Sequence, residues 1–214
     1  MTGGGMRGRA APKTESLETR LLRRDDWPVV ESLFGPRGAC GGCWCMYWQV
    51  EHGGKTWQAM SGAPARRAFR KLVEEGGVHG VLAFSDDEPV GWCCFGPHRS
   101  FPRLVHARSL ARPRAEDSWC VVCFYIKAGW RGAGVASRLL DTATEAAFAA
   151  GAREVEGFPV NPKGALPNAF AWTGLASMFE AAGYRRISDK GAGKEIYLKA
   201  KPRSRRAAAP PSRG

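Results

Sequence analysis

The stretch from Trp119 to Gly151 constrains the fold of this chain more than any other. It begins with eight apolar residues that end at Ile126 and are mostly β-branched or aromatic. Such a run is typical of a strand buried on both faces. A glycine-rich turn follows, and from Val135 apolar residues recur at helical spacing as far as Gly151, a residue type that commonly ends helices. The stretch therefore predicts a strand, a tight turn and a helix in direct succession.

The chemistry of this turn favours an anion. The first N–H groups of a helix have no internal partners, and the helix dipole places partial positive charge there. Gly132 and Gly134 carry no Cβ, so that a phosphate can approach the main chain, and Arg131 adds a charge-assisted contact. The turn is predicted to hold a phosphorylated ligand. The alternative is that it serves only as a tight connection, because short motifs specify function loosely.

Two motifs resemble one known family. The pattern Arg131-x-x-Gly134-x-Ala136, after a strand and at the start of a helix, resembles the acetyl-CoA pyrophosphate loop of the GNAT N-acetyltransferases. The stretch WTGLASMFEAAGY, from Trp172 to Tyr184, resembles the later helix of the same family. Order and spacing of the two motifs agree with the family, and the resemblance covers residues 17–198.

The fold expected is a single α/β domain with a mixed, GNAT-like sheet and helices on both faces, since strands and helices intersperse along the chain. We expect a disordered N-terminal tail over 1–16, the domain over 17–198 and a basic, disordered C-terminal tail over 199–214. Strands are predicted at 18–22, 78–84, 90–95, 119–126, 153–160, 184–188 and 195–199. Helices are predicted at 27–34, 64–75, 135–150 and 169–182.

The resemblance implies an activity. A GNAT-like enzyme uses acetyl-CoA as co-substrate, and a primary amine of a small molecule or a protein attacks the acetyl thioester directly. By position in the motif, main-chain groups of Phe124 and Ile126 would bind the pantetheine arm. The pyrophosphate would be held by the residues of the turn, which are Arg131, Gly132, Ala133, Gly134, Val135, Ala136 and Ser137.

The proton-transfer groups depart from the family pattern. Phe179 stands where the later helix commonly carries a tyrosine, and phenylalanine cannot donate a proton to the departing thiolate. Ser177, Thr173 or water could substitute, or the thiolate could leave unassisted. The carboxylates considered as the general base lie beside the central strand or on the next one, and they are Glu116, Asp117 and Glu156. For each of these the alternative is a charge that only faces solvent.

The segment from Cys40 to Trp48 is unusual in composition. It holds three of the seven cysteines together with three large aromatic residues. The resemblance places it beside the acceptor pocket, so we predict that the acceptor is bound by Trp44, Tyr47 and Trp48. Aromatic walls suit an apolar or cationic acceptor. The competing interpretation is that these rings complete the core.

The cysteines themselves predict reduced thiols. An odd number, with several inside apolar strand patterns, argues against a disulfide framework. Cys40, Cys43 and Cys45, with His52 nearby, could supply metal ligands, but Cys93 and Cys94, the pair considered to complete such a site, are adjacent in the chain, which suits chelation poorly. We expect no metal. A cysteine-rich, metal- or nucleic-acid-binding regulatory module on a GNAT-like fold remains the rival function, with weak or no catalysis.

Charge is concentrated towards the end of the chain. The net charge is +12, and residues 199–214 carry six basic and no acidic side chains. Without aromatic interleaving this tail is expected to be solvated, and nucleic acid is not an expected partner. No apolar run reaches membrane length and no secretory signal opens the sequence, so a cytoplasmic location is expected, with a homodimer left open.

The connection from Gly96 to Ser118 shows no strong periodicity. It carries three prolines and five arginines and leads directly into the central strand. Long connections of this kind are often functional, so we expect it near the site. Its arginines either face solvent or attract an anionic substrate or the phosphates of the co-substrate.

Overall fold

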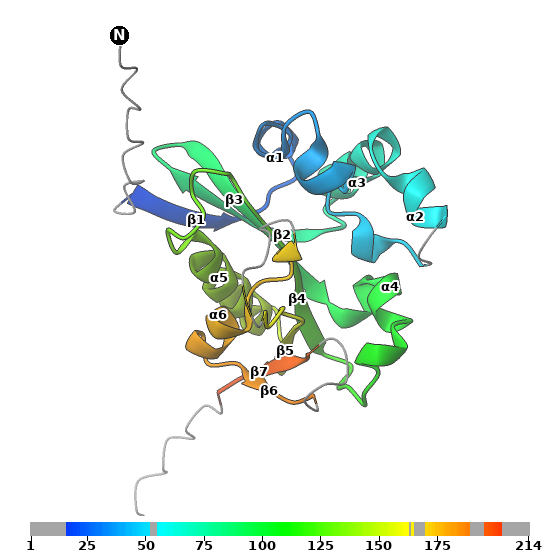
Figure 1. Cartoon of the computed structure of the whole chain (residues 1–214), viewed down its shortest axis with the longest axis vertical. Helices are drawn as coiled ribbons and strands as arrows, with labels where there is room; N and C mark the ends of the chain where they lie inside the picture. Colours follow the sequence, from blue (N-terminus) through cyan, green and yellow to red (C-terminus); the bar gives the residue numbers. More distant parts are fainter. Residues whose placement is uncertain (1–15, 52–54, 163, 165–169, 189–194, 203–214) are drawn as a thin grey trace, which may run out of the picture.

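The computed structural model describes residues 16–51, 55–162, 164, 170–188 and 195–202. Within these residues seven strands form one sheet in the order β1-β2-β3-β4-β5-β7-β6 (Figure 1). Neighbouring strands run antiparallel except for the central pair, β4 and β5, which is parallel. The strands are β1 Leu17–Leu21, β2 His79–Ser85, β3 Glu88–Pro97, β4 Ser118–Ile126, β5 Glu154–Gly157, β6 Arg185–Arg186 and β7 Tyr197–Ala200.

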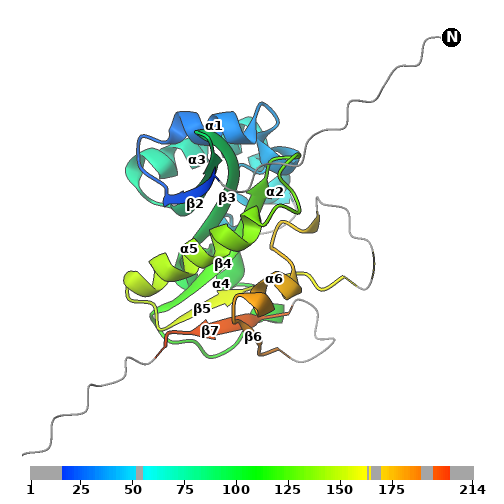
Figure 2. The same ribbon diagram turned by 90° about the vertical axis from the view of Figure 1, so that its left-hand side faces the viewer.

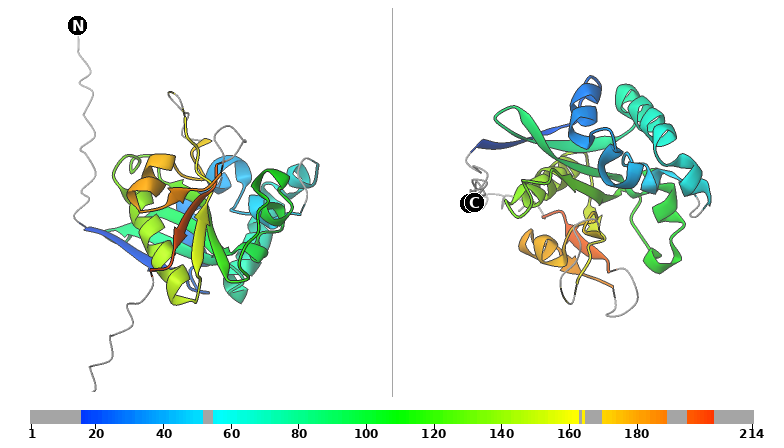
Figure 3. Two further views of the ribbon diagram at one scale, coloured as in Figure 1. Left: turned by 90° about the horizontal axis from the view of Figure 1, so that it is seen from below. Right: turned by 45° about the horizontal axis from the view of Figure 1, so that its top comes forward.

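Helices cover both faces of this sheet (Figures 2 and 3). The α-helices are α1 Trp27–Phe34, α2 Lys55–Met60, α3 Ala63–Glu75, α4 Pro102–Val105, α5 Val135–Ala149 and α6 Ala176–Ala181. Single turns of other helix types are η2 Gly38–Gly42, η3 Tyr47–Gln49, η4 His98–Ser100 and η5 Arg108–Leu110. The arrangement confirms the predicted single mixed sheet with helices on both sides.

Each face of the sheet has its own hydrophobic core. On one face α1 and α3 bury Phe34 and Phe69 against Trp92 of β3. On the other face α5 buries Leu139 and Ala143, which belong to the helical stripe read from the sequence. The two cores share the central strands, because successive side chains of a strand point to opposite faces. We call these the α1/α3 face and the α5 face.

The β2–β3 hairpin follows its predicted turn. Asp86 and Asp87 have φ angles of 46° and 66°, the left-handed conformation that a two-residue hairpin turn requires. The long connection between β3 and β4 is more ordered than its sequence predicts. It contains η4, α4 and η5, and it buries Phe101, Leu104 and Leu110. Turns this short place too few apolar residues in sequence for a helical period to be visible.

Three other elements are clearly shorter than predicted, and one of them is β6, which spans only Arg185–Arg186 of the strand predicted at 184–188. β5 ends at Gly157 instead of reaching Val160, and α6 begins at Ala176, whereas the sequence suggests a helix from Ala169. Residues 165–169 lie outside the described residues. The shortening of β5 and α6 has one cause, because residues 172–176 form main-chain hydrogen bonds with β4 and with Val160. The helix α2 was not predicted. Among the described residues, no helix combines the length and apolarity needed to cross a membrane.

The last strand extends beyond the boundary drawn in the sequence at Lys199. In β7, Lys199 lies opposite Val155 and Ala200 opposite Glu154, and the N–H of Lys201 donates to the C=O of Arg153 at 2.8 Å. The folded domain therefore continues to at least Lys201, and the predicted tail boundary cuts through a strand.

This boundary gives a prediction of stability. A chain ending at Leu198 should melt at least about 4 °C below a chain ending at Pro202, because it loses the pairing of the last two residues of β7. Thermal unfolding followed by circular dichroism measures the difference, with the full-length protein as reference. Equal melting temperatures of the two truncated chains would show that the end of β7 contributes nothing.

Candidate active site

The site is organised by the separation of β4 from β5. The two strands pair from Ser118 opposite Glu154 to Val121 opposite Gly157, after which β4 continues to Ile126 without β5. On its other side β4 contains a bulge: Cys94 lies opposite Cys123 and Phe95 opposite Val121, which leaves Val122 as an extra residue. The parallel strands thus open into a wedge at the centre of the sheet.

Phe179 packs against the end of β5. A Cβ added to Gly157 would lie 2.0 Å from the Phe179 ring, so only glycine leaves room for that ring on the strand. Phe179 is fully buried and also meets Phe124 at 6.3 Å between ring centroids. The residue that replaces the tyrosine of the family pattern therefore lies at the wedge, as part of the α5-face core.

A short segment, Trp172 to Leu175, crosses the wedge. The N–H of Phe124 donates to the C=O of Trp172 at 2.6 Å, and the N–H of Val160 donates to the C=O of Gly174 at 2.9 Å. The family resemblance implies that the main chain of Phe124 and Ile126 binds a pantetheine arm. The N–H of Phe124 is already bonded here, so such a ligand would use its C=O and the groups of Ile126, or displace Trp172.

The predicted phosphate loop is continuous and open. Gly134 directly precedes α5 and has a φ of 77°. The first hydrogen bond of the helix is donated by the N–H of Arg138 to the C=O of Gly134, at 3.1 Å. The N–H groups of residues 135–137 are therefore left at the helix end. A Cβ at Gly132 or Gly134 would meet no atom within 4 Å, and Arg131 is exposed beside them. The structure thus brings residues 131–137 together in an arrangement suited to an anion.

The three aromatic residues predicted to bind the acceptor have different surroundings. Trp44 is 3% exposed and packs on Trp27 and Phe34, so it belongs to the core. Trp48 is also 3% exposed, and its Nε1 donates to the C=O of Val122 in the bulge at 3.0 Å. Tyr47 is half-buried. The structure therefore leaves Tyr47 as the member of this set that can reach a ligand.

Tyr47 is the centre of an aromatic cluster beside the wedge. Its ring lies 5.4 Å from that of Trp57 and 5.1 Å from that of Trp172, both partly exposed. The guanidinium carbon of Arg103 lies 3.9 Å from the Tyr47 ring centroid, and Nη1 of Arg103 donates to the C=O of Tyr47 at 3.2 Å. Trp57, Trp172 and Arg103 were not predicted for the site. Of these, Arg103 belongs to the connection that was expected near the site, and Trp172 is the first residue of the second motif.

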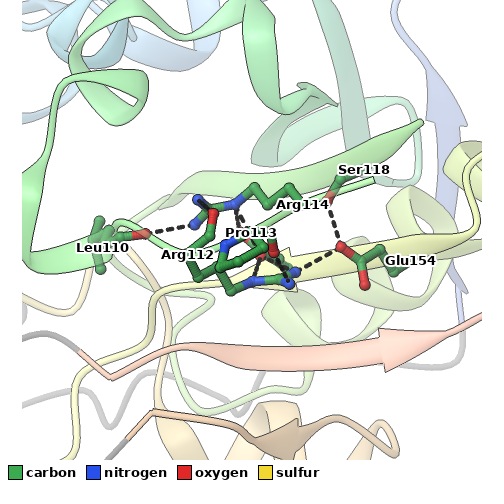
Figure 4. A network of polar contacts seen from close by, with 7 residues as sticks. Leu110, Arg112, Pro113, Arg114, Ser118 and Glu154 are labelled. Atoms are coloured by element: carbon green, nitrogen blue, oxygen red, sulfur yellow. Dashed lines mark hydrogen bonds and ion pairs between the residues drawn. The ribbon is translucent and has the colours of Figure 1, made fainter. Parts of the chain in front are cut away.

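Two carboxylates on β5, one fully buried and one partly exposed, are paired with arginines of the β3–β4 connection (Figure 4). Glu156 has no exposed side-chain surface; Nε of Arg114 lies 2.9 Å from its Oε2, and Arg112 also forms an ion pair with it. Nη2 of Arg112 lies 2.6 Å from Oε1 of Glu154. Two positive and two negative charges therefore balance in this network, and these two arginines face neither solvent nor an anionic ligand.

The network holds the connection on the sheet. Nη2 of Arg114 donates to the C=O of Leu110 at 2.6 Å, and the hydroxyl of Ser118 donates to Glu154 at 2.9 Å. Nearby, burial followed by the charges of Arg114 and Arg112 lowers the pKa of His98 to about 4, so its imidazole is neutral at pH 7. Among the described residues its buried Nε2 has no hydrogen-bond partner.

The other predicted catalytic residues do not meet at the wedge. Glu116 is exposed and Asp117 pairs with Arg153 at 2.8 Å, and both precede β4 at the end away from the phosphate loop. At about 3.3 Å per residue, Asp117 lies roughly 23 Å along the strand from Phe124. Ser177 is exposed on α6. Of the three predicted carboxylates, Glu156 lies nearest to the opening along the strands, one residue before the last β4–β5 pair.

All seven cysteines are free thiols; Cys40 is exposed, Cys43 is half-buried and the other five are buried. Among the described residues, no group of three or more ligating side chains is arranged to hold a metal ion. His52, which the sequence placed near the first cysteines, lies outside them.

The charge network predicts a large effect on stability. Replacing Arg114 with Met should lower the free energy of unfolding by about 3 kcal/mol, because Glu156 stays buried with half of its compensation lost. The matched control is Arg99→Met, since Arg99 is exposed and bonds only a main-chain oxygen; its effect should stay within about 0.5 kcal/mol. Urea unfolding measures both, and a loss below about 1 kcal/mol in Arg114→Met contradicts the prediction.

Comparison with solved structures shows which proteins share this fold. At 12% identity the chain is similar to the putative acetyltransferase yncA from Salmonella typhimurium, solved with acetyl-CoA, covering 92% of this chain and 99% of that one with a TM-score of 0.52. An aminoglycoside 6'-acetyltransferase type Ii matches at 11% identity over 87% and 99% of the two chains (TM-score 0.54). The ribosomal-protein-alanine N-acetyltransferase of Brucella melitensis matches at 13% identity over 86% and 99% (TM-score 0.51).

These similarities establish the fold, and the sequence comparison establishes the family. No curated protein matches the chain in sequence. The model of the acetyltransferase (GNAT) family, however, matches residues 44–163, which is more than half of the 214 residues and includes the phosphate loop, the wedge-forming strands and the charge network. The chain therefore belongs to the GNAT acetyltransferase family.

Proposed function

We propose that this protein is an acetyl-CoA-dependent N-acetyltransferase that transfers the acetyl group to a primary amine. The observation that carries the proposal is the wedge between β4 and β5, with the open loop of residues 131–137 at its end. A pyrophosphate fits the main-chain N–H groups of that loop, with Arg131 as a charged partner. A chain extending from it along β4 could pair with the C=O of Phe124 and the main chain of Ile126 as a neighbouring strand would.

Acetyl-CoA supplies an activated acetyl thioester when bound, and the protein's own residues then align it and manage protons. We propose Glu156 as the proton acceptor, because it is the predicted carboxylate nearest to the opening, on the α1/α3 face where the aromatic cluster lies. Arg112 and Arg114 position that carboxylate. Phe179 offers no proton at the wedge, so the thiolate leaves either unassisted or with help from water or from Thr173, which is buried in the crossing segment.

The acceptor is proposed to contact the half-buried aromatic cluster of Tyr47, Trp57 and Trp172. Because Arg103 already lies over the Tyr47 ring, a second cation at that face would be repelled. An acceptor that lays an apolar part on the rings fits better than one that offers only charge. The structural neighbours include enzymes named for an aminoglycoside and for a ribosomal-protein alanine, so they do not choose between a small-molecule and a protein amine.

The phosphate loop is tested by Gly134→Val. A branched side chain at a φ of 77° is strained and its Cβ enters the space expected for the phosphate, so the Kd for acetyl-CoA should rise about tenfold or more. The matched control is Gly41→Val, because Gly41 is also left-handed, with a φ of 61° and a ψ of 28°, and a Cβ there would also meet no atom within 4 Å. Isothermal titration should show unchanged affinity in the control, with similar destabilisation of both variants. Unchanged affinity in a folded Gly134→Val protein would place the phosphate elsewhere.

The acceptor wall is tested by paired aromatic substitutions. Tyr47→Ala should raise the KM of the acceptor at least about fivefold while the Kd for acetyl-CoA stays constant, since a desolvated aromatic contact contributes about 1 kcal/mol. Trp44→Ala should instead lower the free energy of unfolding by about 3–5 kcal/mol, because Trp44 fills the core. Steady-state kinetics of folded Tyr47→Ala with unaltered acceptor KM would remove Tyr47 from the site.

A further inference from the structure

Two tryptophans cap the edge of β4 at the wedge. Nε1 of Trp48 donates to the C=O of Val122 at 3.0 Å, and the N–H of Phe124 donates to the C=O of Trp172 at 2.6 Å. The centroids of the two tryptophan rings lie 5.6 Å apart. Buried main-chain groups need such partners. Here they come from η3 and from the crossing segment, which are more than a hundred residues apart in the chain.

The two ends of the crossing segment are held differently. At its later end the N–H of Val160 donates to the C=O of Gly174 at 2.9 Å, and the C=O of Val160 accepts from the N–H of Ala176 at 3.0 Å. At its earlier end the Trp172 carbonyl is bonded to β4, and the Trp172 ring packs on Tyr47 with 5.1 Å between centroids. The bonds to Val160 do not involve Trp172. The earlier end can therefore leave β4 while the later end stays in place.

The order of main-chain groups along β4 shows which position the Trp172 carbonyl fills. The N–H of Lys127 donates to Val90 of β3 at 2.9 Å, so the main-chain groups of Ile126, one residue earlier, point to the other side of β4, towards the wedge. The main-chain groups of Phe124 point the same way, as those of every second residue in a strand do. A ligand chain that starts at the phosphate loop and follows this edge meets Ile126 first, then the C=O of Phe124, and last the N–H of Phe124.

We propose that the crossing segment occupies the acyl position of the wedge in the free protein and withdraws when acetyl-CoA binds. Acetyl-CoA carries its phosphates and its acyl carbonyl at opposite ends. A co-substrate held at residues 131–137 therefore brings the acyl carbonyl to the last group of the edge, the N–H of Phe124, which the Trp172 carbonyl already occupies. The two oxygens compete, because one main-chain N–H is a single donor. The inference rests on the proposed function, since it names acetyl-CoA as the competitor.

Withdrawal links the co-substrate to the acceptor wall. The Trp172 ring lies against the rings of Tyr47 and Trp48, so it leaves both when its carbonyl leaves β4. Acetyl-CoA therefore rearranges the acceptor wall, and the acceptor binds after it. The same coupling acts on affinity, because a ligand that needs the withdrawn state binds more weakly in proportion to the fraction of molecules in that state. A change that weakens the capped state should raise the affinity for acetyl-CoA, even though it removes contacts within the protein.

Isothermal titration of the full-length protein tests this gain of affinity. Trp172→Ala loses the ring contacts with Tyr47 and Trp48, so its Kd for acetyl-CoA should be at least about fivefold lower than that of the wild type. CoA lacks the acyl carbonyl and does not compete for the Phe124 N–H, so its Kd should stay within about twofold. The matched control is Trp57→Ala, because Trp57 also contacts Tyr47, at 5.4 Å, but lies on α2; the Kd for acetyl-CoA should not change. Equal or weaker binding of acetyl-CoA by Trp172→Ala overturns the proposal.

A spectroscopic measurement follows the segment in the wild-type sequence, so it does not depend on the stability of a variant. Protein labelled with 5-fluorotryptophan is titrated with acetyl-CoA or with CoA in the absence of an acceptor, and the Trp172 resonance is assigned by its loss in Trp172→Phe. Acetyl-CoA should shift the fluorine resonances of Trp172 and Trp48, whereas that of Trp44, in the core, should stay in place. CoA should leave the Trp172 resonance unshifted. A Trp172 resonance that does not move with saturating acetyl-CoA, or moves equally with CoA, contradicts the withdrawal.

The outcomes separate this inference from the proposed function. Binding of acetyl-CoA with the same Kd to the wild type and to Trp172→Ala contradicts the role of the crossing segment and leaves the proposed function standing. Binding of neither acetyl-CoA nor CoA to either protein, at concentrations up to about 1 mM, contradicts the proposed function and, with it, the competitor named here. Binding of acetyl-CoA by Trp172→Ala alone supports both.

Discussion

The main-chain groups of β4 that β5 does not pair are the constraint on which the rest of the structure depends. Buried N–H and C=O groups require partners, and β5 supplies them only as far as Gly157. Beyond that point the Trp172 carbonyl satisfies Phe124, and the remaining edge of β4 faces the wedge. The bulge at Val122 turns this edge away from the regular ladder. A ligand that pairs with the strand therefore completes the sheet in the way that a neighbouring strand would.

The opening can persist because the two sides of the wedge are fixed independently. On the α5 face the Phe179 ring occupies the space over Gly157, which holds the end of β5 in place. On the α1/α3 face the network of Arg112, Arg114, Glu154 and Glu156 binds the β3–β4 connection to β5. A buried ion-pair network of this kind contributes little net stability, but leaving one of its charges unpaired is strongly unfavourable. It therefore fixes the arrangement of the connection more than it adds to the stability of the fold.

Whether the sequence predicts a structural feature depends on how far apart in the chain the interacting residues lie. Local patterns were sufficient to predict β4, the glycine turn and α5. A buried apolar run and a helical apolar stripe can both be recognised from residues that are close together in the chain. The hairpin at Asp86 and Asp87 was predictable for the same reason. The wedge-crossing segment was not, since its conformation is set by hydrogen bonds to β4 and Val160, which are distant in sequence.

The roles of side chains also depend on contacts with residues that are distant in the chain. Trp44, Tyr47 and Trp48 lie within five residues and share a composition, yet two are in the core and one is half-buried. Only the turn geometry around Cys45, with its left-handed residues, separates them. The arginines of the connection were visible as charges, but their partners Glu154 and Glu156 lie on β5, about forty residues away in the chain. No periodicity links residues over that distance, so the ion pairs follow from the tertiary fold alone.

The two chemical environments of the site meet within one peptide unit. Cys123 belongs to the α1/α3 face, with the thiols and the aromatic cluster, whereas Phe124 belongs to the α5 face, with Phe179. The N–H that Trp172 accepts is that of the peptide bond between them. Because successive side chains of β4 alternate between the faces and the bulge at Val122 sets where they do so, the two cores of the sheet adjoin at this point.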